Sequence, residues 1–398
     1  MISSVIKKLS ENSYNKLKYK VVVIDPHAAM ENDIGGLQNT SVIDFKSEES
    51  SINLFMNTSE DILSQTESII SIFKNIISDR YNSKLERVLR YSIHLLLEKG
   101  EFNLINLRKL LTEIEYRNKI IKEVQEFVQP NIIEFFRVDF NELKTQSYQE
   151  AISPIISFID EMQLLPAFND TNQTRNIKEE ISNNFITMLS LDQTTLGLNI
   201  TKTIAGFAMQ AILQLVQSHS FNEHIILVID EVSVIENPII SRFLSEARKY
   251  NLSLILAGQY FEQISNDLQK AIFTNVVNYF IFRVSKIDAM LLEGNMKMEV
   301  AVKNSCLTRI KILTELNDRE CIARIGKEGR LLGAFKGRTL DFVPEPRKIV
   351  SRKQKVHSTK KEDNEQNKNS FSIESNSSLK DIMKKQSSSR KIMNFQES

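Results

Sequence analysis

Short runs of aliphatic residues recur along the chain, and such runs predict strands that are buried on both faces. The clearest run is His224–Ile229, in which a stretch of aliphatic residues is uninterrupted, and Lys20–Ile24 is rich in β-branched residues. Further strands are predicted at Val42–Phe45, Phe185–Leu191, Leu252–Gln259 and Val276–Val284. Runs of this kind are typical of a parallel sheet that is covered by helices on both sides.

Between these runs, apolar residues spaced three and four positions apart predict amphipathic helices. The predicted helices are Ile2–Leu17, Thr201–Gln217, Ile239–Tyr250 and Phe261–Ala271. Strands that alternate with helices favour an α/β fold with a doubly wound, mostly parallel sheet. Glu320–Ile325 and Arg330–Phe335, which flank Gly326 and Gly329, predict a hairpin after this core.

A long helical stretch interrupts the alternation. Residues 57–165 show helical spacing almost throughout, with Asn103 as the N-cap of one helix, and we expect an all-α insertion over residues 57–180. The α/β core is therefore expected in two parts, residues 1–56 and 181–345. Residues 346–398 are rich in Ser, Asn, Lys and Gln and poor in apolar residues, which predicts a disordered tail.

The composition is that of a globular protein, with 41% hydrophobic and 25% charged residues. The net charge of +1 conceals a basic tail, because residues 347–398 hold 13 Lys/Arg and 6 Asp/Glu. This tail contacts phosphates or only improves solubility; composition leaves both open. Cys306 and Cys321 fit no metal or disulfide framework. No apolar run reaches the roughly 18 residues of a membrane helix, and the sequence shows no signal peptide.

Acidic and amide residues follow three of the predicted strands. Asp230 and Glu231 follow the strand His224–Ile229, and Gln259 ends the strand that begins at Leu252. Asp25 and His27 follow the strand Lys20–Ile24. The carboxyl ends of parallel strands meet at one edge of a sheet, where ligands of α/β proteins bind. In a P-loop ATPase, Asp230 would help hold Mg²⁺ and Glu231 would activate the attacking water, while Gln259 would contact the γ-phosphate. The alternative is a solvated strand exit, with Asp25-Pro26-His27 as an ordinary turn.

The other half of such an ATP site is missing from this sequence. No G-x-x-x-x-G-K-S/T phosphate loop occurs, and the single Gly-Lys step, Gly326-Lys327, lacks the upstream glycine and the following Ser/Thr. Arg248 ends a predicted helix, where a cation favours the helix dipole. A second interpretation makes Arg248 an arginine finger that acts on a neighbouring subunit, and Arg283 is its rival.

Three segments together resemble the HerA/FtsK superfamily of DNA-pumping P-loop ATPases, and most of all its HerA-like or TraD/TraG-like branch of conjugation and type IV secretion. The segments are Val21–His27, Ile226–Glu231 and Ser245–Gln259, and the resemblance covers roughly residues 1–340. It implies a RecA-like core, ATP and Mg²⁺ as cofactors, double-stranded DNA as partner and a homo-hexamer. Asp25 and His27 would then lie beside Asp230 at the nucleotide, and Glu231, Gln259 and Arg248 would be catalytic.

In that family the phosphate loop precedes a helix that Met1–Leu17 resembles, so we expect an N-terminally truncated motor subunit that needs a phosphate loop from outside this sequence. The resemblance implies a cytoplasmic place, or one at the inner face of the membrane beside secretion or conjugation machinery. Two alternatives stay open. One is a non-catalytic assembly subunit that binds no nucleotide itself, and the other is a decayed gene product that exposes a sheet edge.

Overall fold

The computed structural model describes residues 1–12, 19–47, 52–54, 61–77, 80–168, 175–296, 306–327 and 330–346. The predicted tail, except for Pro346, lies outside these residues, as does the end of the first predicted helix at 13–17. All the described residues belong to one compact unit, Met1–Lys348, which is separate from Ile349–Ser398.

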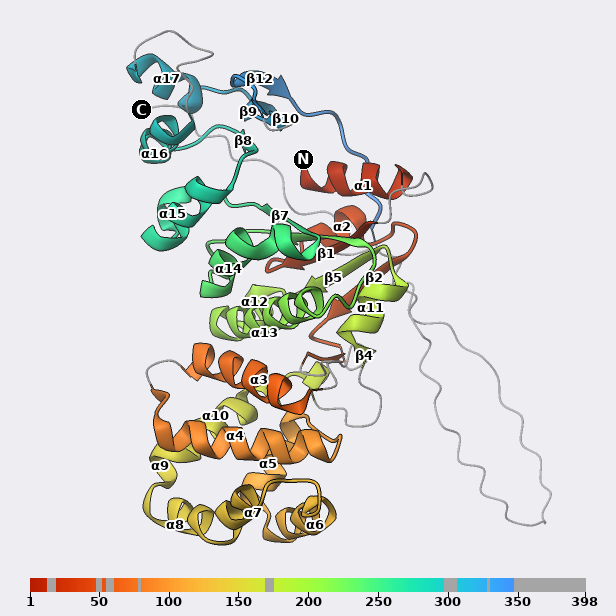
Figure 1. The fold of residues 1–398 in the computed structure, drawn as a ribbon. Coiled ribbons are helices and arrows are strands. Elements are labelled where there is room, and N and C mark those ends of the chain that lie inside the picture. The colour runs from red at the N-terminus through yellow and green to blue at the C-terminus, as the bar shows by residue number, and fades with distance from the viewer. Residues whose placement is uncertain are drawn as a thin grey trace, which may run out of the picture. The chain divides into compact units, whose positions relative to one another are not determined.

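A five-stranded sheet, parallel throughout, forms the centre of the core (Figure 1). Its order across the sheet is β2 (Thr40–Asp44), β5 (Ile186–Ser190), β1 (Tyr19–Asp25), β6 (His224–Ile229) and β7 (Leu252–Leu256). In the middle of the sheet, Val23 pairs with Met188 on one side and with Val228 on the other. These strands confirm five of the predicted strands and the parallel sheet.

Successive residues of the central strand β1 enter two different hydrophobic cores. Val21 and Val23 pack with Ile6 of helix α1 (Ile2–Asn12) and with α2 (Met30–Ile34). Val22 and Ile24 belong to the other core, which includes helices α13 (Leu198–Gln217) and α14 (Pro238–Glu246). The strand thus needs aliphatic side chains at every position, which explains the run in its sequence and confirms the doubly wound fold.

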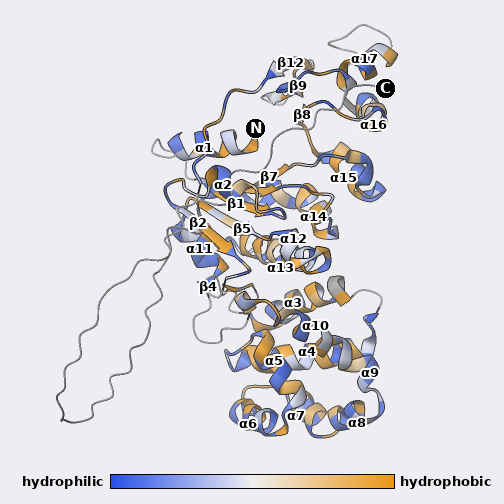
Figure 2. Cartoon of the chain, turned by 180° about the vertical axis from the view of Figure 1, so that it is seen from behind, coloured by the Kyte–Doolittle hydropathy of each residue, from blue (hydrophilic) through white to orange (hydrophobic). Residues whose placement is uncertain are grey.

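The region between β2 and β5 is mostly helical, as predicted. Its helices are α3 (Ile62–Ile77), α4 (Ser83–Glu98), α5 (Leu104–Thr112), α6 (Ile114–Val124), α7 (Pro130–Arg137), α8 (Asp139–Gln146), α9 (Tyr148–Ala151) and α10 (Ser153–Met162), followed by η3 (Pro166–Phe168). The side chain of Asn103 accepts a hydrogen bond from the Asn106 amide at 2.7 Å and so caps α5 as expected. Figure 2 shows apolar and polar residues interspersed along these helices, and many of the apolar ones are buried in the larger hydrophobic core.

Short elements connect the helical region to the sheet. Strands β3 (Ile52–Asn53) and β4 (Arg175–Asn176) pair in parallel, and α11 (Ile177–Asn183) and α12 (Gln193–Leu196) flank β5. Arg175 donates to both carboxylate oxygens of Glu180 at 2.6 and 2.7 Å and also to the Ser41 hydroxyl at 2.6 Å. This network ties the end of the helical region to strand β2.

One prediction about the strands is wrong. The segment Val276–Val284 was expected to extend the parallel sheet, but it forms the short strand β8 (Tyr279–Ile281), which pairs antiparallel with β9 (Glu320–Arg324). Strand β12 (Phe335–Arg338) pairs on the other side of β9. Phe280 is 44% exposed while Ile281 is buried, so β8 buries a single face, as a strand of a half-covered antiparallel sheet does.

The last part of the described chain has a small core of its own. Ile281, Leu313 and Ile322 pack together there, and Arg324 stacks on Tyr279 with 4.6 Å from guanidinium carbon to ring centroid. The predicted hairpin exists, although β9 pairs with β12 and the nearer strands β10 (Gly326–Lys327) and β11 (Arg330–Leu331) form a separate ladder. The remaining helices are η4 (Ala247–Tyr250), η5 (Phe261–Gln263), α15 (Asn266–Asn275), α16 (Lys286–Met296) and α17 (Cys306–Thr314).

An aromatic cluster joins the helical region to the α/β core. Phe207 of α13 packs with Phe73 of α3 and Phe158 of α10, with ring centroids 6.3 and 5.6 Å away. All three rings are buried. We expect Phe207→Ala to lower the free energy of unfolding by about 3–5 kcal/mol, because it removes a buried ring and leaves a cavity. Chemical denaturation measures this change.

Leu198→Ala is the matched control, because this side chain of the same helix is 43% exposed. It should cost less than about 1 kcal/mol. Equal losses of unfolding free energy for the two variants would contradict a stabilising role for the Phe207 ring at this junction.

Candidate functional site

The parallel ladder brings the carboxyl ends of β1, β6 and β7 to one edge. At its end, the amide of Asp230 donates to the carbonyl of Ile24 at 3.0 Å, and the amide of Ala257 donates to that of Ile229 at 2.9 Å. The residues that follow the three strands are therefore neighbours in space. Asp25, Asp230 and Glu231 belong to this group, and Gln259 meets it through its backbone.

Asp25 is fully buried at the end of β1. Its carboxylate accepts hydrogen bonds from the backbone amides of His27 at 2.9 Å and Met30 at 2.7 Å. Burial raises the pKa of Asp25, and the backbone hydrogen bonds oppose this rise. The side chain thus holds the loop after β1 in shape, while the His27 side chain is exposed. The Asp-Pro-His sequence serves as a structured turn at the edge.

Asp230 follows β6 and is half-buried. Burial raises its pKa, and the nearby negative charges of Asp25 and Glu231 raise it further. Such a concentration of negative charge is costly without a cation and is a feature of functional sites. Yet within the described ranges no three His, Cys, Asp or Glu side chains are arranged to hold a metal ion. Asp230 could still contribute a single carboxylate to a cation such as Mg²⁺, which commonly keeps several waters and takes few protein ligands.

Glu231 is buried and adopts a left-handed backbone conformation with φ 44°. This conformation is uncommon for a residue other than glycine, and it persists where surrounding contacts hold it. The Oε1 atom accepts hydrogen bonds from the Ser233 hydroxyl at 2.9 Å and from the Gln259 amide at 3.1 Å. The carboxylate of Glu231 thus bridges the exits of β6 and β7, and its orientation is fixed by both.

Gln259 reaches the site in a way that its sequence position did not predict. The backbone amide, and not the side chain, contacts Glu231, and the side chain is exposed. Gly258, the preceding residue, lies close enough that an added Cβ would stand 3.8 Å from Glu231 Oε1. The exposed amide side chain of Gln259 remains available for a ligand at this edge.

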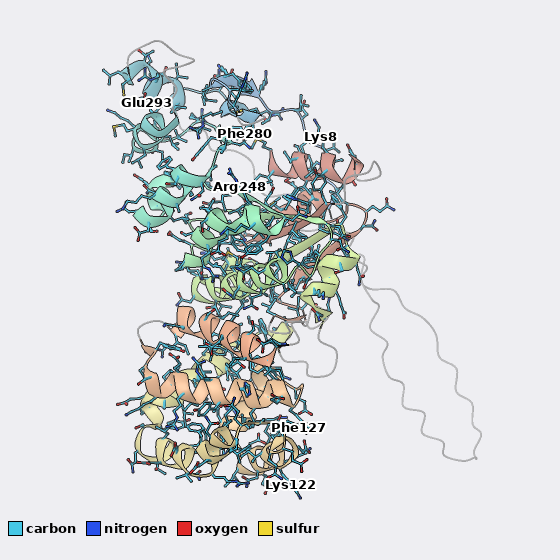
Figure 3. All side chains as sticks on the ribbon, viewed as in Figure 1. Lys8, Lys122, Phe127, Arg248, Phe280 and Glu293 are labelled. Atoms are coloured by element: carbon cyan, nitrogen blue, oxygen red, sulfur yellow. The ribbon has the colours of Figure 1, made fainter. Side chains whose placement is uncertain are left out.

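Arg248 is not part of this edge within one chain. It belongs to η4, which precedes β7, whereas Gln259 follows β7, so the two lie at opposite ends of that strand. Its side chain is exposed, and Figure 3 labels it on the η4 surface. Arg283, the rival, is paired with Asp318 at 3.3 Å. A role for Arg248 at phosphates would therefore be one toward a neighbouring subunit.

Two polar residues at the same edge were not predicted from the sequence, Asp192 and its partner Lys46. Asp192 follows β5 and accepts hydrogen bonds from Lys46 at 2.8 Å, Thr194 at 2.5 Å and Thr195 at 2.8 Å. The pKa of Asp192 lies far below its usual range, mainly because of the hydrogen bond from Lys46. Asp192 stands directly after a predicted strand, so the rule that singled out Asp230 could have found it.

The raised pKa of Asp230 predicts a gain in stability when its charge is removed. Ionisation of Asp230 costs folding free energy once the pH rises above the ordinary carboxyl range, because its pKa is higher in the folded state. We expect Asp230→Asn to have a higher Tm than wild type near about pH 7 with EDTA present. The difference should shrink toward about pH 3, where the carboxyl is protonated in both states.

The control is Asp267→Asn, since the side chain of Asp267 is 96% exposed. It should leave Tm nearly unchanged across this range. A lower Tm for Asp230→Asn at neutral pH would contradict the strained acidic edge.

Comparisons with known proteins support the fold at this edge. No model of a protein family matches the chain, and no curated sequence matches it. The chain resembles the bacterial conjugative coupling protein TrwBdeltaN70 in an unbound monoclinic form, with a TM-score of 0.57, 12% identity, and coverage of 87% of this chain and 84% of that one. It also resembles the plasmid coupling protein TrwB in complex with ADP and Mg²⁺, with a TM-score of 0.55, 12% identity, and coverage of 86% and 83%.

A third structure, TrwB with the non-hydrolysable GTP analogue GDPNP, matches with a TM-score of 0.54, 13% identity, and coverage of 87% and 84%.

None of the described helices combines the length and the apolar composition that crossing a bilayer requires. The parallel sheet, the helical insertion and these likenesses agree, and the chain has the RecA-like α/β fold that the conjugative coupling protein TrwB also has.

Proposed function

We propose that this chain is a subunit of an ATP-driven motor that moves double-stranded DNA in conjugation or type IV secretion. One observation carries the proposal: Asp230 and Glu231 meet Asp25 and the Gln259 backbone at the carboxyl edge of a parallel sheet. This is the place where α/β proteins bind ligands, and the acids are of the kind that ATP hydrolysis requires. The fold shared with TrwB, which was solved with ADP and Mg²⁺, supports nucleotide use.

Each residue at the edge has a definite role in this proposal. Asp230 holds Mg²⁺ through its water shell, and Asp25 keeps the adjoining loop in place through its bonds to His27 and Met30. Glu231 accepts a proton from the attacking water, and its contacts to Ser233 and Gln259 aim the carboxylate. Gln259 senses the terminal phosphate with its exposed side chain, and His27 faces the solvent beside the nucleotide.

In this proposal the phosphate loop comes from outside the residues of this sequence, in which no G-x-x-x-x-G-K-S/T run occurs. Such a loop supplies backbone amides to the phosphates, a lysine charge and a hydroxyl ligand for Mg²⁺. We infer that ATP and Mg²⁺ bind where such a loop meets the edge formed by β1, β6 and β7. The protein would act in the cytoplasm or at the inner face of the membrane, beside the secretion or conjugation machinery.

The alternative is a non-catalytic assembly subunit. Its support is that the residues of the hydrolytic half are present while the phosphate loop is not. Such a subunit would keep the oligomeric surface and offer Arg248 to a complete partner. Tight binding of ATP by the isolated chain would exclude this alternative.

The central test replaces the proposed base. In the protein expressed from its whole reading frame, traced upstream to the preceding stop codon, Glu231→Gln should lower DNA-stimulated ATP turnover by at least about 100-fold. Nucleotide binding should persist, because the amide keeps the shape of the side chain. The matched control is Glu262→Gln, an exposed glutamate near the start of η5.

The outcomes separate the hypotheses. Equal turnover by Glu231→Gln and wild type would show that Glu231 is not the base. Absence of both ATP binding and turnover in the wild-type protein would favour the non-catalytic subunit.

A mixing experiment tests the role of Arg248 between subunits of a homo-hexamer. Arg248→Ala and Glu231→Gln should each be inactive alone. When they are mixed, a Glu231→Gln subunit offers its Arg248 to an Arg248→Ala neighbour, so part of the ATP turnover should return. Full activity of Arg248→Ala alone, or no recovery in the mixture, would exclude an arginine finger at this position.

A further inference from the structure

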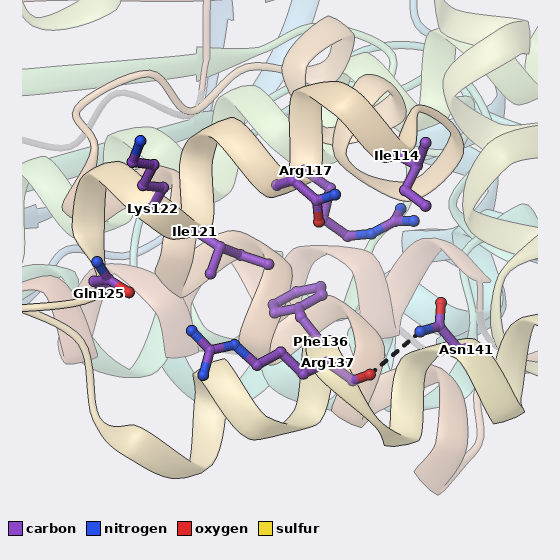
Figure 4. A pocket seen from close by; sticks show the side chains of 9 residues that line it. Ile114, Arg117, Ile121, Lys122, Gln125, Phe136, Arg137 and Asn141 are labelled. Carbon is purple, nitrogen blue, oxygen red and sulfur yellow. Dashed lines mark hydrogen bonds between the residues drawn. The ribbon is translucent and has the colours of Figure 1, made fainter.

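A pocket far along the chain from the acidic edge opens between helices α6, α7 and α8 (Figure 4). Its volume is about 450 Å³. Three kinds of side chain line it in equal number: cationic, amide and apolar. The cations are Arg117, Lys122 and Arg137, and no acidic side chain is among the lining residues. A pocket of this composition attracts an anion.

Arg117 is the unusual residue of the group. It is only 3% exposed, and burial lowers the pKa of its guanidinium, which nonetheless stays charged. One nitrogen donates to the carbonyl of Leu110 at 2.8 Å, and the guanidinium carbon lies 4.6 Å from the ring centroid of Phe140. Within the described part of the chain, no carboxylate pairs with it. The carbonyl and the ring offset part of the cost of burying this charge, and an anion at the pocket would offset more of it.

The other two cations are also unpaired. Lys122 and Arg137 are exposed, and neither forms an ion pair with any residue that the structure describes. Two acids of the same region are paired with other cations: Asp139 pairs with Arg87 at 2.5 Å, and Glu123 pairs with Lys99 at 3.0 Å. Lys122 and Arg137 thus have no ion-pair partner among the described residues, and Arg117 is held by a carbonyl and an aromatic ring.

The surroundings favour a single carboxylate over a nucleic acid. Residues 114–146 carry five Lys/Arg and six Asp/Glu, and three of the five cations line the pocket, so a DNA backbone would meet acidic side chains around it. The walls of the pocket include the apolar side chains of Ile114, Ile121 and Phe136. Phe127, which follows α6, is 73% exposed, and Figure 3 labels it in the same helical region as Lys122. The apolar side chains of a peptide would contact these apolar residues, whereas a DNA backbone has no apolar groups that fit them.

We propose that this pocket is a docking site for a partner protein and binds a peptide segment in which one carboxylate is flanked by apolar side chains. The carboxylate binds the exposed guanidinium of Arg137, which can donate two parallel hydrogen bonds, and the buried charge of Arg117 adds to the positive potential of the pocket. The flanking apolar side chains cover Ile114 and Phe136. This site would give a motor subunit a means to receive a partner that is independent of its nucleotide edge.

The test uses short peptides as probes and the full chain as receptor. Fluorescently labelled heptapeptide amides with central Asp or Glu, flanked by Leu, Phe or Val, are compared with matched peptides that carry Asn or Gln. We expect the acidic peptides to bind by fluorescence anisotropy and the amide peptides to bind at least about tenfold more weakly. Arg137→Gln should weaken binding of the acidic peptides by about tenfold or more.

Variants with exposed side chains avoid the risk of unfolding. Lys122→Gln should weaken binding, and Lys119→Gln, an exposed lysine of the same helix that does not line the pocket, should not. Arg117→Met removes the buried charge and should weaken binding if its circular dichroism matches that of wild type.

Three results would overturn the proposal. The first is the absence of binding by every acidic peptide, and the second is equal binding of acidic and amide peptides. The third is unchanged peptide binding in Arg137→Gln together with loss of binding to a 30-base-pair DNA duplex, which would make the pocket a phosphate site.

Discussion

The alignment of β1, β6 and β7 in one parallel ladder is the constraint on which the candidate site depends. Because the strands run in the same direction and in register, their last residues arrive at a common edge. The ladder continues beyond the strands through the bond from the Asp230 amide to Ile24 and from the Ala257 amide to Ile229. Glu231 then closes the gap between two exits by accepting from the Gln259 amide. The geometry of the acids is thus a consequence of the sheet.

Several features of this edge reduce stability, as is common at functional sites. Burial raises the pKa values of Asp25 and Asp230, and Glu231 occupies a left-handed backbone conformation. A fold optimised for stability alone would replace such groups with apolar or solvated ones. The hydrophobic cores on both faces of the sheet compensate, since every position of the Val21–Ile24 run is buried. In the helical region the buried guanidinium of Arg117, which has no ion-pair partner among the described residues, is a comparable cost.

Much of this could be predicted from the sequence because buried parallel strands leave a strong local pattern. The runs at Lys20–Ile24 and His224–Ile229 indicated both the sheet and the place of Asp230 and Glu231. Strand β8 was misassigned because a run of apolar residues does not reveal which partner strand it will pair with. The backbone contact of Gln259, the Lys46 pair of Asp192 and the buried charge of Arg117 depend on residues distant in sequence, so local patterns could not show them.

Hydrogen–deuterium exchange tests most directly whether this edge is where nucleotide meets the protein. Exchange is measured on the protein expressed from its whole reading frame, with and without Mg²⁺ and a non-hydrolysable ATP analogue. The account predicts slower exchange in the backbone of 25–31, 230–233 and 257–260, the segments that carry Asp25, Asp230, Glu231 and Gln259. Unchanged exchange in these segments, or protection confined to helices α3–α10, would contradict it.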